Sequence, residues 1–210
     1  MDATAVKPER PGIEPFPRST DYFSALGLPR KLAIDLQDLE RRYYELSRRF
    51  HPDFFQTAPP RERLTSLENS ALVNKAYRTL RDPLARAEYL VKLERGAGTE
   101  IQTEAPRALF EEILELNELL SDYKLGDSAE RLALRSQLVE KDHELRAEFE
   151  ALEQHLTNDL FPRWDATVDS GAIGEAEKHP LLSEISRIIG NRAYLRRVLT
   201  SLEEALSDNP

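Results

Sequence analysis

Apolar residues recur along most of this chain at intervals of three and four residues, the spacing that places them on one face of an α-helix. The first long stretch with this pattern follows Asp35, a residue suited to cap a helix. Its apolar positions are Leu36, Leu39, Tyr43, Leu46 and Phe50. Pro52 lacks an N–H and disfavours the α conformation at the residue before it. We therefore predict a helix that ends near residue 50, with His51 and Asp53 in a loop.

Three more helices are predicted in the first half. A short one stops at Gly27, another covers residues 61–80, and a fourth follows Asp82-Pro83. The expected inward positions of the 61–80 helix are Leu64, Leu67, Ala71, Tyr77 and Leu80. The two longer helices would form an antiparallel hairpin that the two shorter ones close.

The second half of the chain repeats the helical pattern on a larger scale. We predict helices from Pro106 to about Ser121, over 128–156 and over 181–206, which together make a three-helix bundle. The residues expected to interrupt the chain between the last two are Pro162, Gly171, Gly174 and Pro180. Trp164 is expected to anchor this region by burial.

These elements predict an all-α fold in two domains: an N-terminal four-helix domain built on a helical hairpin, and a C-terminal three-helix bundle. Residues 1–19 carry four prolines and no periodic apolar face, so we predict a flexible tail there. The predicted boundaries are 20–95 for the first domain, 96–105 for a linker and 106–210 for the bundle.

Composition and charge narrow the function classes. The chain has no cysteine, which excludes disulfides, a thiol nucleophile and cysteine-ligated metal. No apolar run approaches the roughly 18 residues of a membrane span, so a soluble cytoplasmic protein without membrane contact is expected. Residues 20–95 carry 14 basic and 11 acidic side chains, net +3, whereas 96–210 carry 12 and 24, net −12. The acidic half argues against nucleic-acid binding.

The tripeptide His51-Pro52-Asp53 is the first candidate for chemistry. His51 as a general base oriented by Asp53 would define an enzyme, but no nucleophile, metal cluster or glycine-rich phosphate loop accompanies the pair. Asp53 could instead simply accept hydrogen bonds from amides of the turn. In isolation the tripeptide is weak evidence, and its context decides between these interpretations.

That context resembles the J-domain family over residues 21–94. A helix bearing arginines precedes the tripeptide, and the segment from Asn74 to Leu90 follows it. The resemblance implies a co-chaperone that is not an enzyme, needs no cofactor, and docks on an HscA or DnaK-type chaperone ATPase. The residues it assigns to chaperone binding are His51, Pro52, Asp53, Arg41, Arg42, Arg48 and Arg49. Phe54 departs from the lysine that J-domains commonly have there.

The continuation of the chain is similar to HscB, the J-protein of iron–sulfur cluster assembly. After Leu93 a short linker runs into an acidic helix instead of a Gly/Phe-rich region. The resemblance implies delivery of the scaffold protein IscU, held by Phe110, Leu114, Glu115, Glu118, Asp122 and Tyr194. Glu111 departs from the apolar residue expected there. Two alternatives stay open: Phe110 and Leu114 as ordinary core residues, and an adaptor for a different client of a DnaK-type chaperone.

Overall fold

The computed structural model describes residues 12–96, 107–170 and 175–207, without the side chains of 107–113, 128 and 175–177. Within these ranges the fold is all-helical, with an N-terminal helical hairpin and a C-terminal helical region. Contacts divide the chain into two compact units. The first comprises residues 1–30 and 34–85, and the second comprises 31–33 and 86–210.

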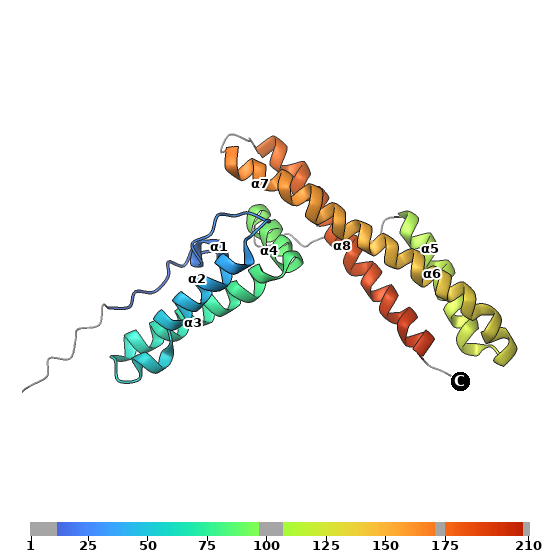
Figure 1. Ribbon diagram of the computed structural model, residues 1–210, viewed down its shortest axis with the longest axis horizontal. Helices are drawn as coiled ribbons and strands as arrows, with labels where there is room; N and C mark the ends of the chain where they lie inside the picture. Colours follow the sequence, from blue (N-terminus) through green and yellow to red (C-terminus); the bar gives the residue numbers. More distant parts are fainter. Residues whose placement is uncertain (1–11, 97–106, 171–174, 208–210) are drawn as a thin grey trace, which may run out of the picture. The chain divides into compact units, whose positions relative to one another are not determined.

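The first unit is built on a helical hairpin (Figure 1). Its elements are α1 (Tyr22–Ala25), α2 (Leu36–Arg49), the 3-10 turn η1 (Pro52–Phe55) and α3 (Pro60–Arg81). Helices α2 and α3 lie side by side, and α1 packs on α3. The predicted ends of the first two helices are confirmed: Asp21 and Asp35 cap them, and Gly27 takes a φ of 64° directly after α1.

Asp21 shows how a buried carboxylate is kept charged at the start of α1. Burial by itself would raise the pKa of Asp21. The N–H and hydroxyl of Ser24 and the guanidinium of Arg30 outweigh that effect and lower the pKa of Asp21 below its ordinary value. Arg30 Nη2 lies 2.8 Å from Asp21 Oδ2. The ionised side chain therefore ties the first helix to the loop that follows it.

The inward face of α3 differs from the prediction. Leu64 and Leu67 are 56% and 55% exposed, and Ala71 is exposed as well. The buried positions are Thr65, Ser66, Asn69, Val73, Ala76 and Leu80. The prediction followed the large apolar residues, whereas the packed face also contains short polar side chains, of which Ser66 and Asn69 form hydrogen bonds inside the unit.

The predicted tail also needs a correction. Residues 1–11 lie outside the described range, but Glu14 and Phe16 are hydrogen-bonded to the buried side chain of Asn69. This part of the chain is therefore docked on α3. The sequence offered no periodic pattern from which such a contact could be predicted.

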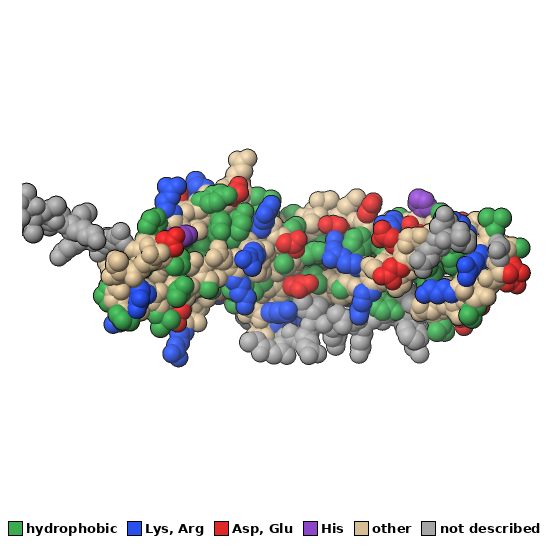
Figure 2. Space-filling model, turned by 90° about the horizontal axis from the view of Figure 1, so that it is seen from below, with side chains coloured by type: hydrophobic (Ala, Val, Ile, Leu, Met, Phe, Trp, Pro, Cys, Tyr) green, Lys and Arg blue, Asp and Glu red, His purple; other side chains and the backbone are tan. Residues whose placement is uncertain are grey.

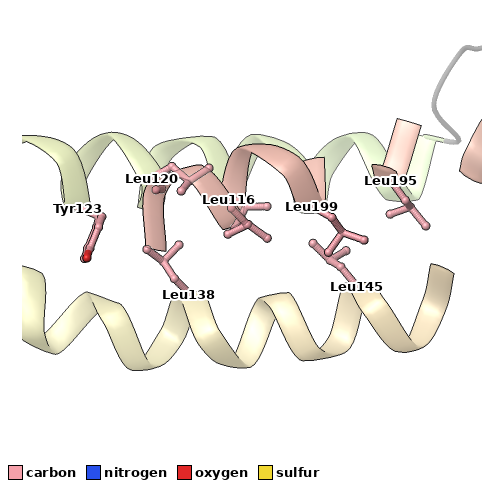
Figure 3. Packing of buried hydrophobic residues seen from close by; sticks show 9 residues of the cluster. Leu116, Leu120, Tyr123, Leu138, Leu145, Leu195 and Leu199 are labelled. Atoms are coloured by element: carbon pink, nitrogen blue, oxygen red, sulfur yellow. The ribbon is translucent and has the colours of Figure 1, made fainter. Parts of the chain in front are cut away.

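The second unit contains α4 (Pro83–Arg95) from Arg86 on, and the helices that follow it. These are α5 (Arg107–Leu125), α6 (Ser128–His155), α7 (Phe161–Ser170) and α8 (Glu175–Ser207), with the π-helical turn η2 (Leu156–Leu160) between α6 and α7. Helices α5, α6 and α8 form the predicted three-helix bundle. Figure 3 shows leucines and a tyrosine from the three helices meeting in its core: Leu116, Leu120, Tyr123, Leu138, Leu145, Leu195 and Leu199.

Two of the predicted breaks are wrong. Pro162 lies inside α7, directly after the π-helical turn in which Phe161 N–H donates to the carbonyl of Leu156. A widened turn of this kind accommodates a residue that has no N–H to donate. Pro180 lies inside α8, where burial of the apolar residues that follow it maintains the helix at the cost of one backbone bond. Gly171 and Gly174 lie outside the described residues, as do Pro106 and all of the predicted 96–105 linker except Gly96.

The short segment 31–33 belongs to the second unit because Asp165 of α7 holds its backbone. Asp165 Oδ1 accepts the N–H of Leu32 at 2.6 Å and Oδ2 accepts that of Ala33 at 2.9 Å. Burial raises the pKa of Asp165, although these two bonds oppose the shift. Trp164 beside it is 1% exposed, which confirms its predicted burial. None of the described helices is both long and apolar enough to cross a membrane.

Candidate functional site

His51 begins the short turn η1 and caps it with its own ring. Its Nδ1 accepts the N–H of Asp53 at 3.3 Å, and its carbonyl accepts the N–H of Phe54 at 3.0 Å. Pro52 occupies the first position of the turn, where a missing N–H costs no hydrogen bond. The predicted loop is therefore a 3-10 turn at Asp53, and the cap is His51 and not Asp53. The backbone N–H of Asp53 therefore helps to orient the imidazole.

The side chains of this turn face outward. Those of His51 and Asp53 are 49% and 69% exposed, with Nδ1 and Oδ2 3.6 Å apart. Because Nδ1 accepts a hydrogen bond, the neutral ring carries its proton on Nε2 and can donate it to a partner. The Phe54 ring stands edge-on to the imidazole, with centroids 5.8 Å apart, and is 49% exposed. The turn thus presents a donor, an anion and an apolar ring together.

Buried residues hold the turn at both ends. Phe50 precedes His51 and is 5% exposed, and Phe55 closes the turn at 8%. The hydroxyl of Ser66, on α3, donates to the carbonyl of Phe50 at 2.9 Å. This bond satisfies a carbonyl at the end of α2 that has no partner within the helix. Phe50 was expected on the apolar face of its helix, whereas nothing in the sequence singled out Ser66 as a supporting residue.

The four predicted arginines separate into two pairs. Arg41 is bonded to Asp38 and Glu45, and Arg42 Nε donates to Asp38 Oδ2 at 2.6 Å. Arg42 also donates to the carbonyl of Gly27 at 2.8 Å, so it holds the end of α1 in place. The guanidinium groups of Arg42 and Arg41 lower the pKa of Asp38. These two arginines are partly neutralised within the unit.

Arg48 and Arg49 form the second pair, next to the turn. Both are exposed, and within residues 12–96 neither has an ion-pair partner. Arg49 stands with its guanidinium carbon 5.3 Å from the centre of the Phe50 ring. Unpaired cations beside the exposed turn leave this end of α2 able to contact an acidic surface.

The residues assigned to client binding lie on α5 and α8 of the second unit. Leu114 is 54% exposed, and Glu115, Glu118 and Asp122 are exposed beside it, whereas Leu116 points into the bundle. Leu114 is therefore not a core residue. Phe110 lies four residues before Leu114 on the same helix, but its side chain, like that of Glu111, falls outside the described residues.

Tyr194 is half-buried on α8, with the Arg197 guanidinium carbon 5.6 Å from its ring centre.

The face of the molecule shown in Figure 2 carries basic, acidic and hydrophobic side chains interspersed, with no broad region of one charge among the coloured residues. Within the described ranges, no group of acidic and histidine side chains is arranged to hold a metal ion.

Comparisons with known proteins bear on both surfaces. The family model of the DnaJ domain matches residues 21–89, which include the turn at His51 and both flanking helices. The chaperone HscB from Vibrio cholerae superposes with a TM-score of 0.61 at 28% sequence identity, covering 88% of this chain and 96% of that one. The human co-chaperone protein HscB gives 0.57 at 25% identity, covering 97% and 91%.

The chain is a J-domain protein, a co-chaperone of DnaK-type chaperones: the matched domain contains the exposed tripeptide on its turn between two packed helices. The similarity to the two HscB structures extends over the bundle as well. It is an HscB-like J-domain protein.

Proposed function

We propose that this co-chaperone stimulates ATP hydrolysis by an HscA or DnaK-type chaperone and delivers an IscU-type iron–sulfur scaffold to it. The turn at His51 engages the ATPase, and the acidic and apolar surface of α5 with Tyr194 binds the scaffold. The exposed, backbone-oriented His51-Pro52-Asp53 turn is the single observation that carries the first part.

The turn is suited to bias an ATPase with two arrangements. A ligand shifts such an equilibrium only by contacting one arrangement better than the other. Because buried Phe50 and Phe55 anchor the turn, His51 and Asp53 bind with little loss of conformational freedom. Arg48 and Arg49 beside it would raise the association rate with an acidic partner surface. The proposed order is electrostatic encounter followed by insertion of the turn.

An exposed leucine among acidic side chains supports the proposal of a client-binding surface on α5. A leucine left 54% exposed on a packed bundle is available to a partner, and Glu115 and Glu118 on the same helix add charge that would select a basic surface. The HscB-like fold supports an iron–sulfur scaffold as that partner. Cysteine-ligated cluster chemistry would belong to the scaffold, because this chain has no cysteine.

The ATPase half of the proposal is tested with His51→Gln. This variant loses the imidazole and is expected to abolish stimulation of a DnaK-type ATPase in single-turnover hydrolysis. The matched control is His143→Gln, because His143 is an exposed histidine on α6 in the other unit. Stimulation by the control should equal that of the wild type. Full stimulation by His51→Gln would refute the proposed role of the turn.

The client half is tested with the double variant Phe110→Ala and Leu114→Ala. Loss of two anchor residues is expected to weaken scaffold binding at least tenfold in calorimetric titration, roughly 1.4 kcal/mol or more. ATPase stimulation without scaffold should not change. Leu132→Ala with Val139→Ala is the matched control, since these leucine and valine side chains are exposed on α6. An unaltered scaffold titration by the double variant rules out this surface.

The alternative is an adaptor that brings a different client to the same chaperone. It shares the exposed turn and differs only in what the bundle binds. A pull-down with the wild-type chain separates the two: the leading proposal expects a DnaK-type chaperone and an IscU-like scaffold together. Recovery of the chaperone with a different client, and no scaffold, would favour the adaptor.

A further inference from the structure

The described N-terminal residues are held on α3 by one buried amide. Asn69 is 2% exposed, and both ends of its side chain are used: Oδ1 accepts the N–H of Phe16 at 3.1 Å, and Nδ2 donates to the carbonyl of Glu14 at 2.9 Å. A buried amide without these partners would be costly. Residues 14–16, here called the N-terminal strap, therefore complete the first unit.

The strap reaches the residue that precedes the exposed turn. The ring of Phe16 meets that of Phe50 edge to face, with centroids 5.4 Å apart at 71°. The Arg49 guanidinium also stands over the Phe50 ring. Phe50 is only 5% exposed and is followed directly by His51. The strap thus packs against the side chain on which the turn is anchored.

One face of α3 secures both the strap and the start of the turn. Ser66 lies three residues before Asn69 and so on the same side of the helix. Ser66 fixes the Phe50 carbonyl, while Asn69 fixes the strap that covers the Phe50 ring. Because the peptide unit is planar, the direction of that carbonyl sets the plane in which the His51 N–H lies. Main chain and side chain of Phe50 are constrained together.

We propose that Phe16 is a positioning residue for the His51-Pro52-Asp53 turn, acting through Phe50. Without the strap the Phe50 ring loses its cover, and the turn spends less time in the arrangement that a chaperone binds. The apparent affinity then falls by the populated fraction, while the complex once formed is the same. This functional consequence rests on the proposed function; the effect on the order of the turn does not.

The test compares the full-length wild type with Phe16→Ala by hydrogen exchange and by ATPase stimulation. The amides of Asp53 and Phe54, which bond to His51, are expected to exchange about two- to tenfold faster, the factor that loss of an aromatic pair supplies. The concentration for half-maximal stimulation should rise, by at most the same factor, with maximal stimulation unchanged. Phe16→Leu should give a smaller effect, and Arg18→Ala, at an exposed position two residues after the strap, none.

Several outcomes would overturn the positioning role. One is unchanged exchange at Asp53 and Phe54 in Phe16→Ala. A second is equally accelerated exchange throughout α2 and α3, which would make the strap a general stabiliser. A third is faster exchange of the turn with an unchanged half-stimulating concentration. Full stimulation by His51→Gln would instead refute the proposed function, and the exchange rates would still decide whether the strap orders the turn.

Discussion

Ser66→Ala removes the hydroxyl that holds the Phe50 carbonyl in a buried hydrogen bond. Ser66 is fully buried, and its Oγ lies 2.9 Å from that carbonyl oxygen. A buried acceptor left without a donor costs about 1–3 kcal/mol. Alanine is a better helix former than serine by about 0.5 kcal/mol, which offsets part of the loss. The expected net destabilisation is about 0.5–2.5 kcal/mol.

In a unit of this size, each kcal/mol lowers the unfolding midpoint by roughly 4–8 °C, so a central value of about 1.5 kcal/mol corresponds to roughly 6–12 °C. Thermal unfolding followed by circular dichroism measures this change. Trp164 is the chain's single tryptophan and lies in the second unit, so its fluorescence reports that unit separately. The midpoint reported by Trp164 is not expected to move.

Ser70→Ala is the matched control, because Ser70 is a half-buried serine on the same helix for which the described residues supply no hydrogen-bond partner. The Ser70→Ala substitution gains the same helix propensity and leaves no hydrogen-bond acceptor without its donor. A midpoint for Ser66→Ala at or above that of Ser70→Ala would refute the reasoning. So would an equal shift in Trp164 fluorescence, since the lost bond lies wholly in the first unit.

Four other substitutions test the roles assigned above. Asp21→Asn keeps a capping side chain but loses the charge that holds Arg30, and should destabilise the first unit by about 1–2 kcal/mol at pH 7. Because the folded-state pKa of Asp21 is lowered, the difference from wild type is present above the ordinary aspartate pKa of 3.8 and shrinks as the pH falls below it, which urea titrations across that range would show. Gly27→Ala should cost at least about 1 kcal/mol in the same titration, because φ is 64° and a Cβ would lie 3.0 Å from Arg42. Arg42→Ala should lower stability by about 1 kcal/mol through the lost bond to the Gly27 carbonyl. Arg48→Ala should instead leave stability unchanged and slow chaperone association at low salt; equal effects of the two variants on stability would contradict this division.

The periodicity of the chain was sufficient for most helices. Spacing of three and four, with the cap at Asp35 and the stop at Gly27, located α1, α2 and α6 to within about two residues. Such signals are local, because a cap and a helical stripe lie within one or two turns of each other. The same locality explains the wrong breaks at Pro162 and Pro180, where packing of distant apolar residues preserved the helix.

The identity of the exposed turn was also available from sequence, since the tripeptide and its flanking helices are contiguous. Its geometry was not. That His51 and not Asp53 is the cap, and that Arg42 is occupied by the carbonyl of Gly27, depend on which atoms the fold brings together. The same holds for Leu64 and Leu67, whose size indicated burial and whose side chains are exposed.

The sequence by itself determined an all-helical protein with a hairpin, an exposed His51-Pro52-Asp53 and an acidic second half. Only the tertiary structure decided what holds that tripeptide in place. Phe16, Ser66 and Asn69 carry no motif, and their partners lie between 16 and 55 residues away along the chain. Hydrogen bonds and ring contacts over such separations leave no periodic trace, because their register is set by the packing of α3 against the rest of the unit.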